Sequence, residues 1–304
     1  MHILALGGNG FIGSHFVDAG VASGHEFSVL SRKPYPVWPH GRPFRHLPGG
    51  FEALAAHPEW LDGIDAVWHG AWSTVPKTAA ADPQSDVQTN LIGVLKVLEL
   101  IRNTPSIKHL VFVSSGGAIY GPGKSQDMIT EDHPLSPLGS YGITKLAAER
   151  YFQIFSMETG LPVTIIRPSN PYGPGQSSVG ILGVITTFLY HAIAGTSATI
   201  FGGGAIVRDF LDVSDVANLM VKAMEVPVPG IYNCGSGKGV TLSEVVSTIE
   251  DIVGCEIKIN EMPARAFDPE RTVLDINRAK NTFGWYPKID LHDGIKRLAQ
   301  EFIL

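Results

Sequence analysis

The feature that most constrains the fold is an alternation of short apolar runs with helical patterns through the first half of the chain. Five runs rich in β-branched and other apolar residues are typical of buried strands: residues 2–7, 26–31, 66–71, 109–115 and 162–168. Between them, three segments have helical periodicity: residues 11–24, 82–103 and 140–160. This order predicts an α/β protein with a Rossmann-type, doubly wound parallel sheet that carries helices on both faces.

The alternation loosens after Arg167, where the sequence becomes rich in Pro, Gly and Ser. A loop of this composition usually carries a functional site. A chain of 304 residues can bury one large core or a main domain with a smaller one attached to it. We therefore expect a dinucleotide-binding domain over residues 1–168 and a smaller, mainly substrate-binding α/β lobe over 169–304. Residues from about 205 to 225 are expected to return to the main domain.

Composition narrows the possible partners and the compartment. A formal net charge of −6, with Lys and Arg scattered along the chain, argues against a nucleic-acid partner. Cys234 and Cys255 are too few for a disulfide framework or a closed thiolate metal site, so we assign no metal ligands. The N-terminus lacks a signal-peptide pattern, and the apolar stretch at 179–195 is shorter than the roughly 20 residues of a membrane span. These features predict a cytoplasmic protein without a membrane segment.

The segment GGNGFIG follows the first predicted strand and opens the first predicted helix. Its glycines, Gly7, Gly10 and Gly13, would let the backbone approach a pyrophosphate, which then binds at the helix N-terminus. NAD sites usually carry an acidic residue at the end of the second strand, but here Ser31 and Arg32 occupy that place. A hydroxyl followed by a guanidinium suits the 2′-phosphate of NADP, and the alternative is a solvated loop with surface charges.

A second motif, SYGITK, places Tyr141 and Lys145 four residues apart on one predicted helix. Both side chains then lie on the same face, one turn apart. A tyrosine becomes a base near neutral pH only when a cation stabilises its phenolate, and Lys145 is such a cation. An isolated pair of this spacing is more often an ordinary surface feature, but the glycine motif and the Ser-Ser strand end before it favour a catalytic pair.

Together with TNLIG at 89–93, RPSNPYGPGQ at 167–176, VRDFLDVSDVA and PARAFDPERTVLDINRA, these motifs resemble the extended short-chain dehydrogenase/reductase family. The resemblance covers nearly the whole chain. It is strongest to the nucleotide-sugar epimerase/dehydratase branch and its UDP-galactose 4-epimerase-like proteins. It implies an enzyme that binds a nicotinamide dinucleotide and a nucleotide-sugar.

The resemblance implies that Tyr141 is the acid/base, that Lys145 holds the nicotinamide ribose, and that Ser115 assists. The residues implied to bind the cofactor are Gly7, Gly10, Phe11, Ile12, Gly13, Ser31, Arg32, Gly70, Ala71, Trp72, Asn90, Ser114, Tyr141, Lys145 and Pro168. Those implied to bind the substrate are Thr74, Ser115, Asn170, Arg208, Arg265, Asp268 and Thr272. Among the latter, Arg208 and Arg265 would clamp the diphosphate, Asp268 would bind the nucleotide ribose, and Thr272 would leave room for an N-acetyl group.

The loop after the fourth predicted strand run, SSGGAIYG, indicates which reaction is possible. In this branch the assisting hydroxyl lies four residues before the Tyr of the turn, which here is Gly116, so Ser115 lies one position early. Dehydratases carry an Asp-Glu pair next, and decarboxylases an acidic residue, where this chain has Gly117 and Ala118. Both activities are therefore disfavoured.

The remaining reaction that fits is 4-epimerisation of a UDP-hexose or UDP-N-acetylhexosamine through a transient 4-keto sugar, with NAD or NADP as cofactor. An NADP-dependent nucleotide-sugar reductase or dehydrogenase needs the same residues, and a non-catalytic dinucleotide-binding regulator is a third alternative. An epimerase would retain NAD, whereas Ser31 and Arg32 favour NADP. The long helices that begin near Asp82 and Ser140 pair in this family, so we expect a homodimer.

Overall fold

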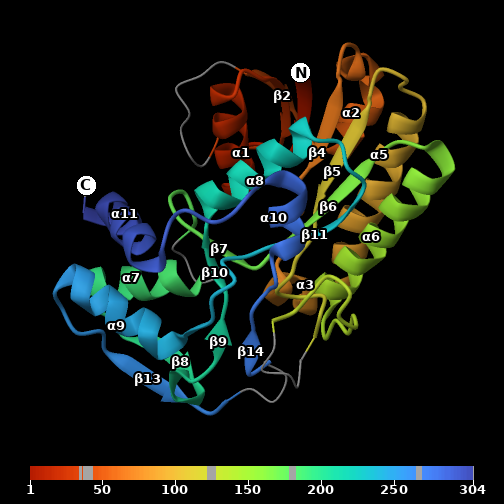
Figure 1. Cartoon of the computed structure of the whole chain (residues 1–304). Coiled ribbons are helices and arrows are strands. Elements are labelled where there is room, and N and C mark those ends of the chain that lie inside the picture. Colours follow the sequence, from red (N-terminus) through yellow and green to blue (C-terminus); the bar gives the residue numbers. More distant parts are fainter. Residues whose placement is uncertain (34–35, 37–43, 122–127, 178–182, 265–268, 304) are drawn as a thin grey trace.

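The computed structural model describes residues 1–33, 36, 44–121, 128–177, 183–264 and 269–303. Its centre is a seven-stranded sheet in which every neighbouring pair is parallel (Figure 1). Across the sheet the strands are β3 (Arg45–Pro48), β2 (Glu26–Ser31), β1 (His2–Leu6), β4 (Ala66–His69), β5 (His109–Val113), β6 (Val163–Pro168) and β11 (Gly230–Cys234). The chain order reverses between β1 and β4, which is where ligands bind in sheets of this kind.

Helices cover both faces of the sheet, as predicted (Figure 1). One face packs against α1 (Phe11–Ala22), α8 (Val213–Glu225) and α10 (Asn277–Phe283). The other packs against α2 (Phe51–Ala56), α5 (Ile92–Arg102) and α6 (Ser140–Thr159). Strand β1 shows why both faces are needed: Ile3 and Ala5 belong to the first core, and Leu4 and Leu6 to the second.

The predicted helix at 82–103 is present but not uniform. It consists of α4 (Pro83–Asp86), a π-helical turn η2 (Val87–Leu91) and α5, and it follows two short helices, η1 (Pro58–Leu61) and α3 (Pro76–Ala81). Within it Asp86 and Asn90 are buried, although the residues between them are exposed. Single π turns inside α-helices are frequent at functional sites, and this one carries the buried Asn90 and directly follows the buried Asp86.

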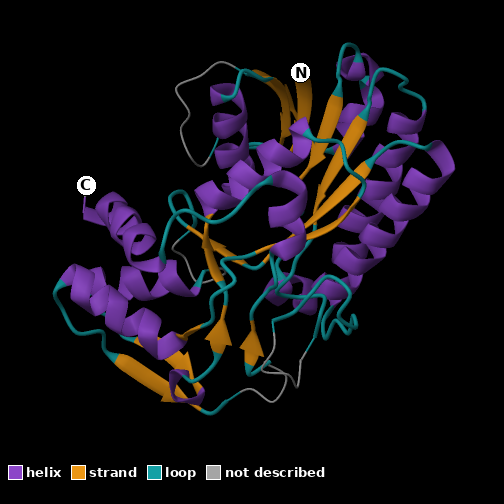
Figure 2. Cartoon of the chain, viewed as in Figure 1, coloured by secondary structure: helices purple, strands orange, loops and turns teal. Residues whose placement is uncertain are grey.

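The C-terminal part forms a smaller lobe with three small sheets around its own core (Figure 2). The sheets pair β7 (Asn170–Tyr172) with β10 (Phe210–Asp212), β8 (Ala198–Phe201) with β13 (Ile259–Met262), and β9 (Val207–Arg208) with both β12 (Val240–Thr241) and β14 (Arg271–Thr272). Its helices are α7 (Val184–Ala194), η3 (Gly202–Gly204), α9 (Leu242–Val253) and α11 (Leu291–Ile303). Among the described residues, no helix has both the length and the apolar character needed to cross a membrane.

The chain returns from the lobe to the central sheet in a way that the sequence indicated only coarsely. Within the expected segment, 205–225, α8 packs beside α1, but β9 and β10 pair in the small sheets. The strand that rejoins the central sheet is β11, which lies beyond that segment. The division of the chain at residue 168 stays a prediction.

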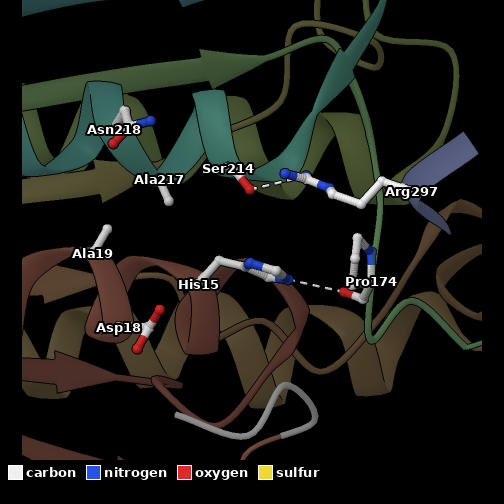
Figure 3. Close-up of a pocket in the computed structure, with 8 residues that line it drawn as sticks. All are labelled: His15, Asp18, Ala19, Pro174, Ser214, Ala217, Asn218 and Arg297. Atoms are coloured by element: carbon white, nitrogen blue, oxygen red, sulfur yellow. Dashed lines mark hydrogen bonds between the residues drawn. The ribbon is translucent and has the colours of Figure 1, made fainter. Parts of the chain in front are cut away.

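The lobe meets the sheet's helices around a pocket of about 220 Å³ between α1, α8 and α11 (Figure 3). Arg297 on α11 donates from Nη2 to both carboxylate oxygens of Asp212, at 2.6 and 2.7 Å, and to Ser214 Oγ at 3.0 Å. Across the pocket His15 Nε2 lies 2.9 Å from the Pro174 carbonyl oxygen. None of the described residues that line it belongs to the predicted site. The pocket lies where α11 of the lobe meets α1 and α8 of the main sheet.

Candidate active site

The glycine loop between β1 and α1 has the close backbone packing that a pyrophosphate site needs. Gly7 has a φ of +83°, which favours glycine, and a Cβ at Gly13 would lie 2.3 Å from the Gly7 carbonyl oxygen. Helix α1 begins after Gly10 with no side-chain cap, so the N–H groups of Phe11 and Ile12 are not satisfied by a capping side chain. The N-terminus of α1 is therefore suited to an anionic group.

The adenosine end of the predicted cofactor site is built around Ser31. Its Oγ accepts a hydrogen bond from the Lys33 backbone N–H at 3.1 Å, while the Arg32 and Lys33 side chains are exposed. Asn9, which the sequence motif includes but which we did not predict as a site residue, donates from Nδ2 to the Lys33 carbonyl at 2.8 Å. Asn9 thus connects the glycine loop to the segment that would distinguish the two cofactors.

Helix α6 brings the predicted acid/base pair together with Ser115. Tyr141 lies in its first turn, with the Ser115 side chain close to its phenol. Burial raises the pKa of Tyr141 to about 12, hydrogen bonding by the Ser115 hydroxyl opposes this shift, and the negative charge of Asp86 adds to it. Ser115 is therefore the hydroxyl that favours the ionised form of Tyr141.

Lys145 lies one turn further along α6 and is buried. Its Nζ donates to the Val113 carbonyl oxygen at 2.7 Å and lies 3.8 Å from the centre of the Trp72 ring, a cation–π contact. Burial lowers the pKa of Lys145 to about 7, against the opposing effect of the Glu149 and Asp86 carboxylates. The charge of this ammonium is thus sensitive to the acidic groups around it.

The geometry also shows how position 116, where the resemblance places the assisting hydroxyl, differs from Ser115. The Gly116 N–H donates to the Pro168 carbonyl oxygen at 2.7 Å, which brings this backbone close to the end of β6. A Cβ at 116 would lie 2.6 Å from Leu274 Cδ1 and 3.0 Å from the Arg167 carbonyl oxygen. A side chain at 116 would require Leu274 to move and would lie tight against the Arg167 carbonyl oxygen, whereas Ser115 is half-buried and acts on Tyr141.

Several buried polar atoms near the carboxyl ends of β1, β4 and β5 have no hydrogen-bond partner among the described residues. They include Asn9 Oδ1, Trp72 Nε1 and Ser114 Oγ. Buried polar atoms are rarely left unsatisfied, so these atoms indicate a polar ligand at this edge. Gly70 and Ala71 lie beside the glycine loop, since a Cβ on Gly7 would meet the Ala71 Cα at 2.8 Å. The described residues fit a dinucleotide along this edge.

The side chains of Asn90 and Thr74 bind other protein groups, and their predicted roles toward cofactor and substrate stay predictions. Asn90 Oδ1 accepts from Ser73 N and Oγ at 2.8 and 3.0 Å. Asn90 Nδ2 donates to Thr74 Oγ1 at 2.9 Å and to Asp86 Oδ1 at 2.8 Å. In this arrangement Asn90 supports the loop after β4, and a direct contact with a cofactor would require breaking these bonds.

The predicted substrate-binding residues of the lobe converge around β7 and β9. Asn170 Nδ2 donates to the Asp209 carbonyl oxygen at 2.9 Å, Arg208 Nη1 donates to the Pro269 carbonyl oxygen at 2.7 Å, and Thr272 is buried opposite Arg208 in the pairing of β14 with β9. Arg265 and Asp268, the other two predicted residues, lie outside the described residues.

Sequence reasoning did not single out Asp209, although it lies in the quoted VRDF segment. Its buried carboxylate accepts hydrogen bonds from Ser236 N and Oγ, both at 2.7 Å, and from Leu274 N at 3.2 Å. Burial raises the pKa of Asp209, against these hydrogen bonds. An aspartate directly before the apolar pair Phe210 and Leu211 was the signal that could have identified it.

Comparison with known proteins identifies the family to which this site belongs. The model of the NAD-dependent epimerase/dehydratase family matches residues 3–235. The chain belongs to this NAD-dependent epimerase/dehydratase family. As a member, it is a nucleotide-sugar enzyme of the epimerase/dehydratase type, and the resemblance drawn from the motifs is confirmed.

Solved structures of the epimerase/dehydratase family share the whole fold. A UDP-glucose 4-epimerase from Thermotoga maritima, solved with UDP-glucose, is 32% identical, with a TM-score of 0.93 over 100% of this chain and 99% of that one. A UDP-glucose 4-epimerase from Thermus thermophilus, solved with NAD, is 32% identical, with a TM-score of 0.90 over 100% of this chain and 99% of that one.

A relative with a different described activity is also similar in sequence. UDP-glucuronic acid decarboxylase 1 from Danio rerio is 27% identical over 99% of this chain and 72% of its own length.

Proposed function

We propose that this protein is an NAD-dependent 4-epimerase of a UDP-hexose or UDP-N-acetylhexosamine. The observation that carries the proposal is the placement of Tyr141 and Lys145 one turn apart on α6, with the Ser115 hydroxyl close enough to lower the pKa of Tyr141. This arrangement supplies one acid/base at a site suited to a dinucleotide. The Gly116 to Ala118 segment beside it contains no acidic residue for a further proton transfer.

Each of these residues has a role in a reversible oxidation at C4 of the sugar. Tyr141 removes the proton of the 4-hydroxyl and later returns it, and the Ser115 hydroxyl favours the ionised form of Tyr141. Lys145, when protonated, stabilises the phenolate electrostatically. The bound nicotinamide supplies a reversible hydride acceptor, which is the chemistry that no side chain provides. Epimerisation then needs only a pocket in which the 4-keto sugar can present its other face.

Two alternatives use the same fold: a decarboxylase, which needs a further acidic residue, and a reductase, which needs the same residues as the epimerase. The Danio rerio relative is a decarboxylase, but the acidic residue that the resemblance associates with that reaction is replaced by Gly117 and Ala118 here. An NADP-dependent reductase is favoured by one observation, the exposed Arg32 beside the buried Ser31. We place this second, because the family and the Thermus thermophilus structure are both described with NAD.

The decisive experiment combines cofactor release with turnover. The purified protein is denatured, and the released cofactor is identified by absorbance and mass. UDP-glucose and UDP-N-acetylglucosamine are then assayed for conversion to their 4-epimers. Retained NAD and interconversion of at least one pair support the proposal. A protein that binds exchangeable NADPH and only consumes it would be a reductase, and one without turnover in any assay would be a binding protein.

We also propose a homodimer through α6. Four large apolar side chains on this helix are exposed: Ile143, Tyr151, Ile154 and Met157. Large exposed apolar patches usually mark an interaction surface, and two such helices would cover each other in a two-fold dimer. The Met157→Glu variant is expected to convert the dimer into a monomer in light scattering, whereas Met262→Glu, at an exposed methionine of the lobe, leaves it unchanged. A monomeric parent would contradict this assignment.

A further inference from the structure

The buried carboxylate of Asp86 lies at the centre of a polar network that connects three elements. Thr74, in the loop after β4, donates to Oδ1 at 2.5 Å, and Asn90, on η2, donates to Oδ1 at 2.8 Å. On the other oxygen, Oδ2 accepts from Ser140 Oγ at 2.8 Å and from Thr144 Oγ1 at 2.9 Å. Asp86 itself is fully buried.

Each of the two donors from α6 lies directly before one member of the catalytic pair. Ser140 precedes Tyr141, and Thr144 precedes Lys145. Their bonds to Asp86 therefore fix the rotation and the depth of the first turn of α6 relative to the loop after β4. Displacements of about 1 Å at such positions are enough to lower a rate by about a hundredfold.

The charge of Asp86 reaches the same two residues. Burial by itself would raise the pKa of Asp86, but the hydrogen bonds from Thr74, Ser140, Thr144 and Asn90 together lower it, so the group is a carboxylate at neutral pH. This negative charge raises the pKa of both Tyr141 and Lys145. The remaining titratable groups that act on Lys145 or respond to it are Glu149 on α6 and His69 on β4.

We infer that Asp86 is a positioning residue for the proposed 4-epimerase: it holds the first turn of α6 against the loop after β4 and supplies a fixed negative charge near the Tyr141 and Lys145 pair. This inference rests on the proposed function for its kinetic consequences, but its structural part does not. The π-helical turn at 87–91 supports this arrangement, because it continues the helix while Asp86 and Asn90 both take part in the network.

The Asp86→Asn variant tests the charge with little change in shape. We expect kcat to fall by about tenfold to a hundredfold, with a smaller change in KM, because the substrate-binding residues of the lobe are untouched. Since Asp86 raises the pKa of Tyr141 and of Lys145, its loss lowers both. Both limbs of the pH profile of kcat should therefore move to lower pH. A role confined to packing would lower kcat and leave the limbs in place.

Two further variants separate geometry from charge. Thr144→Val removes one donor and keeps the carboxylate, so kcat should fall while the pH limbs stay near those of the parent. Asp82→Asn is the matched control, because Asp82 is exposed four residues earlier and caps α4 by accepting from Ser85 N at 2.9 Å. Asparagine caps helices as well as aspartate does, so this variant should behave as the parent.

Amide hydrogen exchange provides a readout that does not need turnover. In Asp86→Asn the first turn of α6 should exchange about tenfold faster than in Asp82→Asn, the effect expected from weakened hydrogen bonds to a charged group. If Asp86→Asn fails to fold, Thr144→Val carries the same comparison. Unchanged exchange in the variant, or unchanged kcat and pH limbs in an active enzyme, would overturn the inference. A parent inactive on every UDP-sugar would overturn only the proposed function.

Discussion

At the scale of single residues, the Ser115 hydroxyl beside Tyr141 makes the most direct prediction. Because this hydroxyl lowers the pKa of Tyr141, its removal in Ser115→Ala should raise that pKa and move the acidic limb of kcat to higher pH. We expect kcat to fall by about a hundredfold, within the usual range for a group that assists proton transfer. The measurement is the pH dependence of kcat.

Ser115→Thr is the conservative control, because threonine keeps the hydroxyl. It should retain most of the activity and the parental pH limb. If Ser115→Ala were as active as the parent across the pH range, Ser115 would not assist Tyr141.

The neighbouring glycines form a matched pair that tests how crowded the loop is. Gly116→Ser should destabilise the protein by about 1–3 kcal/mol, because its Cβ would meet Leu274 and the Arg167 carbonyl oxygen. In Gly117→Ser the nearest atom to the new Cβ is 3.6 Å away and the residue is exposed, so the change should stay within about 0.5 kcal/mol. Urea unfolding measures both, and equal stabilities would contradict this difference in packing.

At the scale of elements, α6 is attached to β6 by a buried ion pair. Arg167 donates to both carboxylate oxygens of Glu149, at 2.9 and 2.6 Å, and both side chains are 1% exposed. Glu149→Gln leaves the Arg167 charge buried without its partner and should cost about 3–5 kcal/mol of unfolding free energy.

The same helix provides the control for this prediction. Glu158 pairs with Arg102 at 2.7 Å, but both side chains are largely exposed. Exposed pairs contribute about 0–1 kcal/mol, so Glu158→Gln should have a small effect in the same urea measurement. A similar loss of unfolding free energy in the two variants would show that burial does not determine the contribution of an ion pair on this helix.

At the scale of the whole molecule, buried histidines make stability depend on pH. Burial, with a smaller contribution from the Lys145 charge, lowers the pKa of His69 to about 3, and burial lowers that of His109 to about 4. The unfolded chain, with a histidine pKa of about 6.5, therefore binds these protons first. The stabilisation is fully present above about pH 6.5 and is lost as the pH falls toward the folded-state values.

Each of these two histidines should lower the free energy of unfolding by about 2 kcal/mol as the pH falls from 6.5 to 5. His69→Leu should reduce the loss of stability between pH 7.5 and pH 5 by about that amount, as measured by urea unfolding. His292→Leu, at an exposed ring, should leave the loss as in the parent. An unchanged loss in His69→Leu would mean that this ring is not kept neutral by the fold.

Patterns within short stretches of the sequence were enough to determine the class of fold and to predict Tyr141 and Lys145 as the acid/base pair. The alternation of strands and helices, the glycines of the first loop and the spacing of Tyr141 and Lys145 are all local, because periodicity and helical geometry act over a few residues. These features identify the parallel sheet and the α6 pair. The preference between NAD and NADP at Ser31 and Arg32 stays a prediction from the same kind of pattern.

Only the tertiary structure decided the features that depend on residues far apart in the chain. Ser115 meets Tyr141, Asp86 collects donors from positions 74, 90, 140 and 144, and β11 joins the sheet beside β6. No local propensity encodes these contacts, because they form only when separate elements pack together. That is why Gly116 could be recognised in the sequence as a missing hydroxyl, while its tight packing beside Leu274 and the Arg167 carbonyl oxygen appears only in the folded chain.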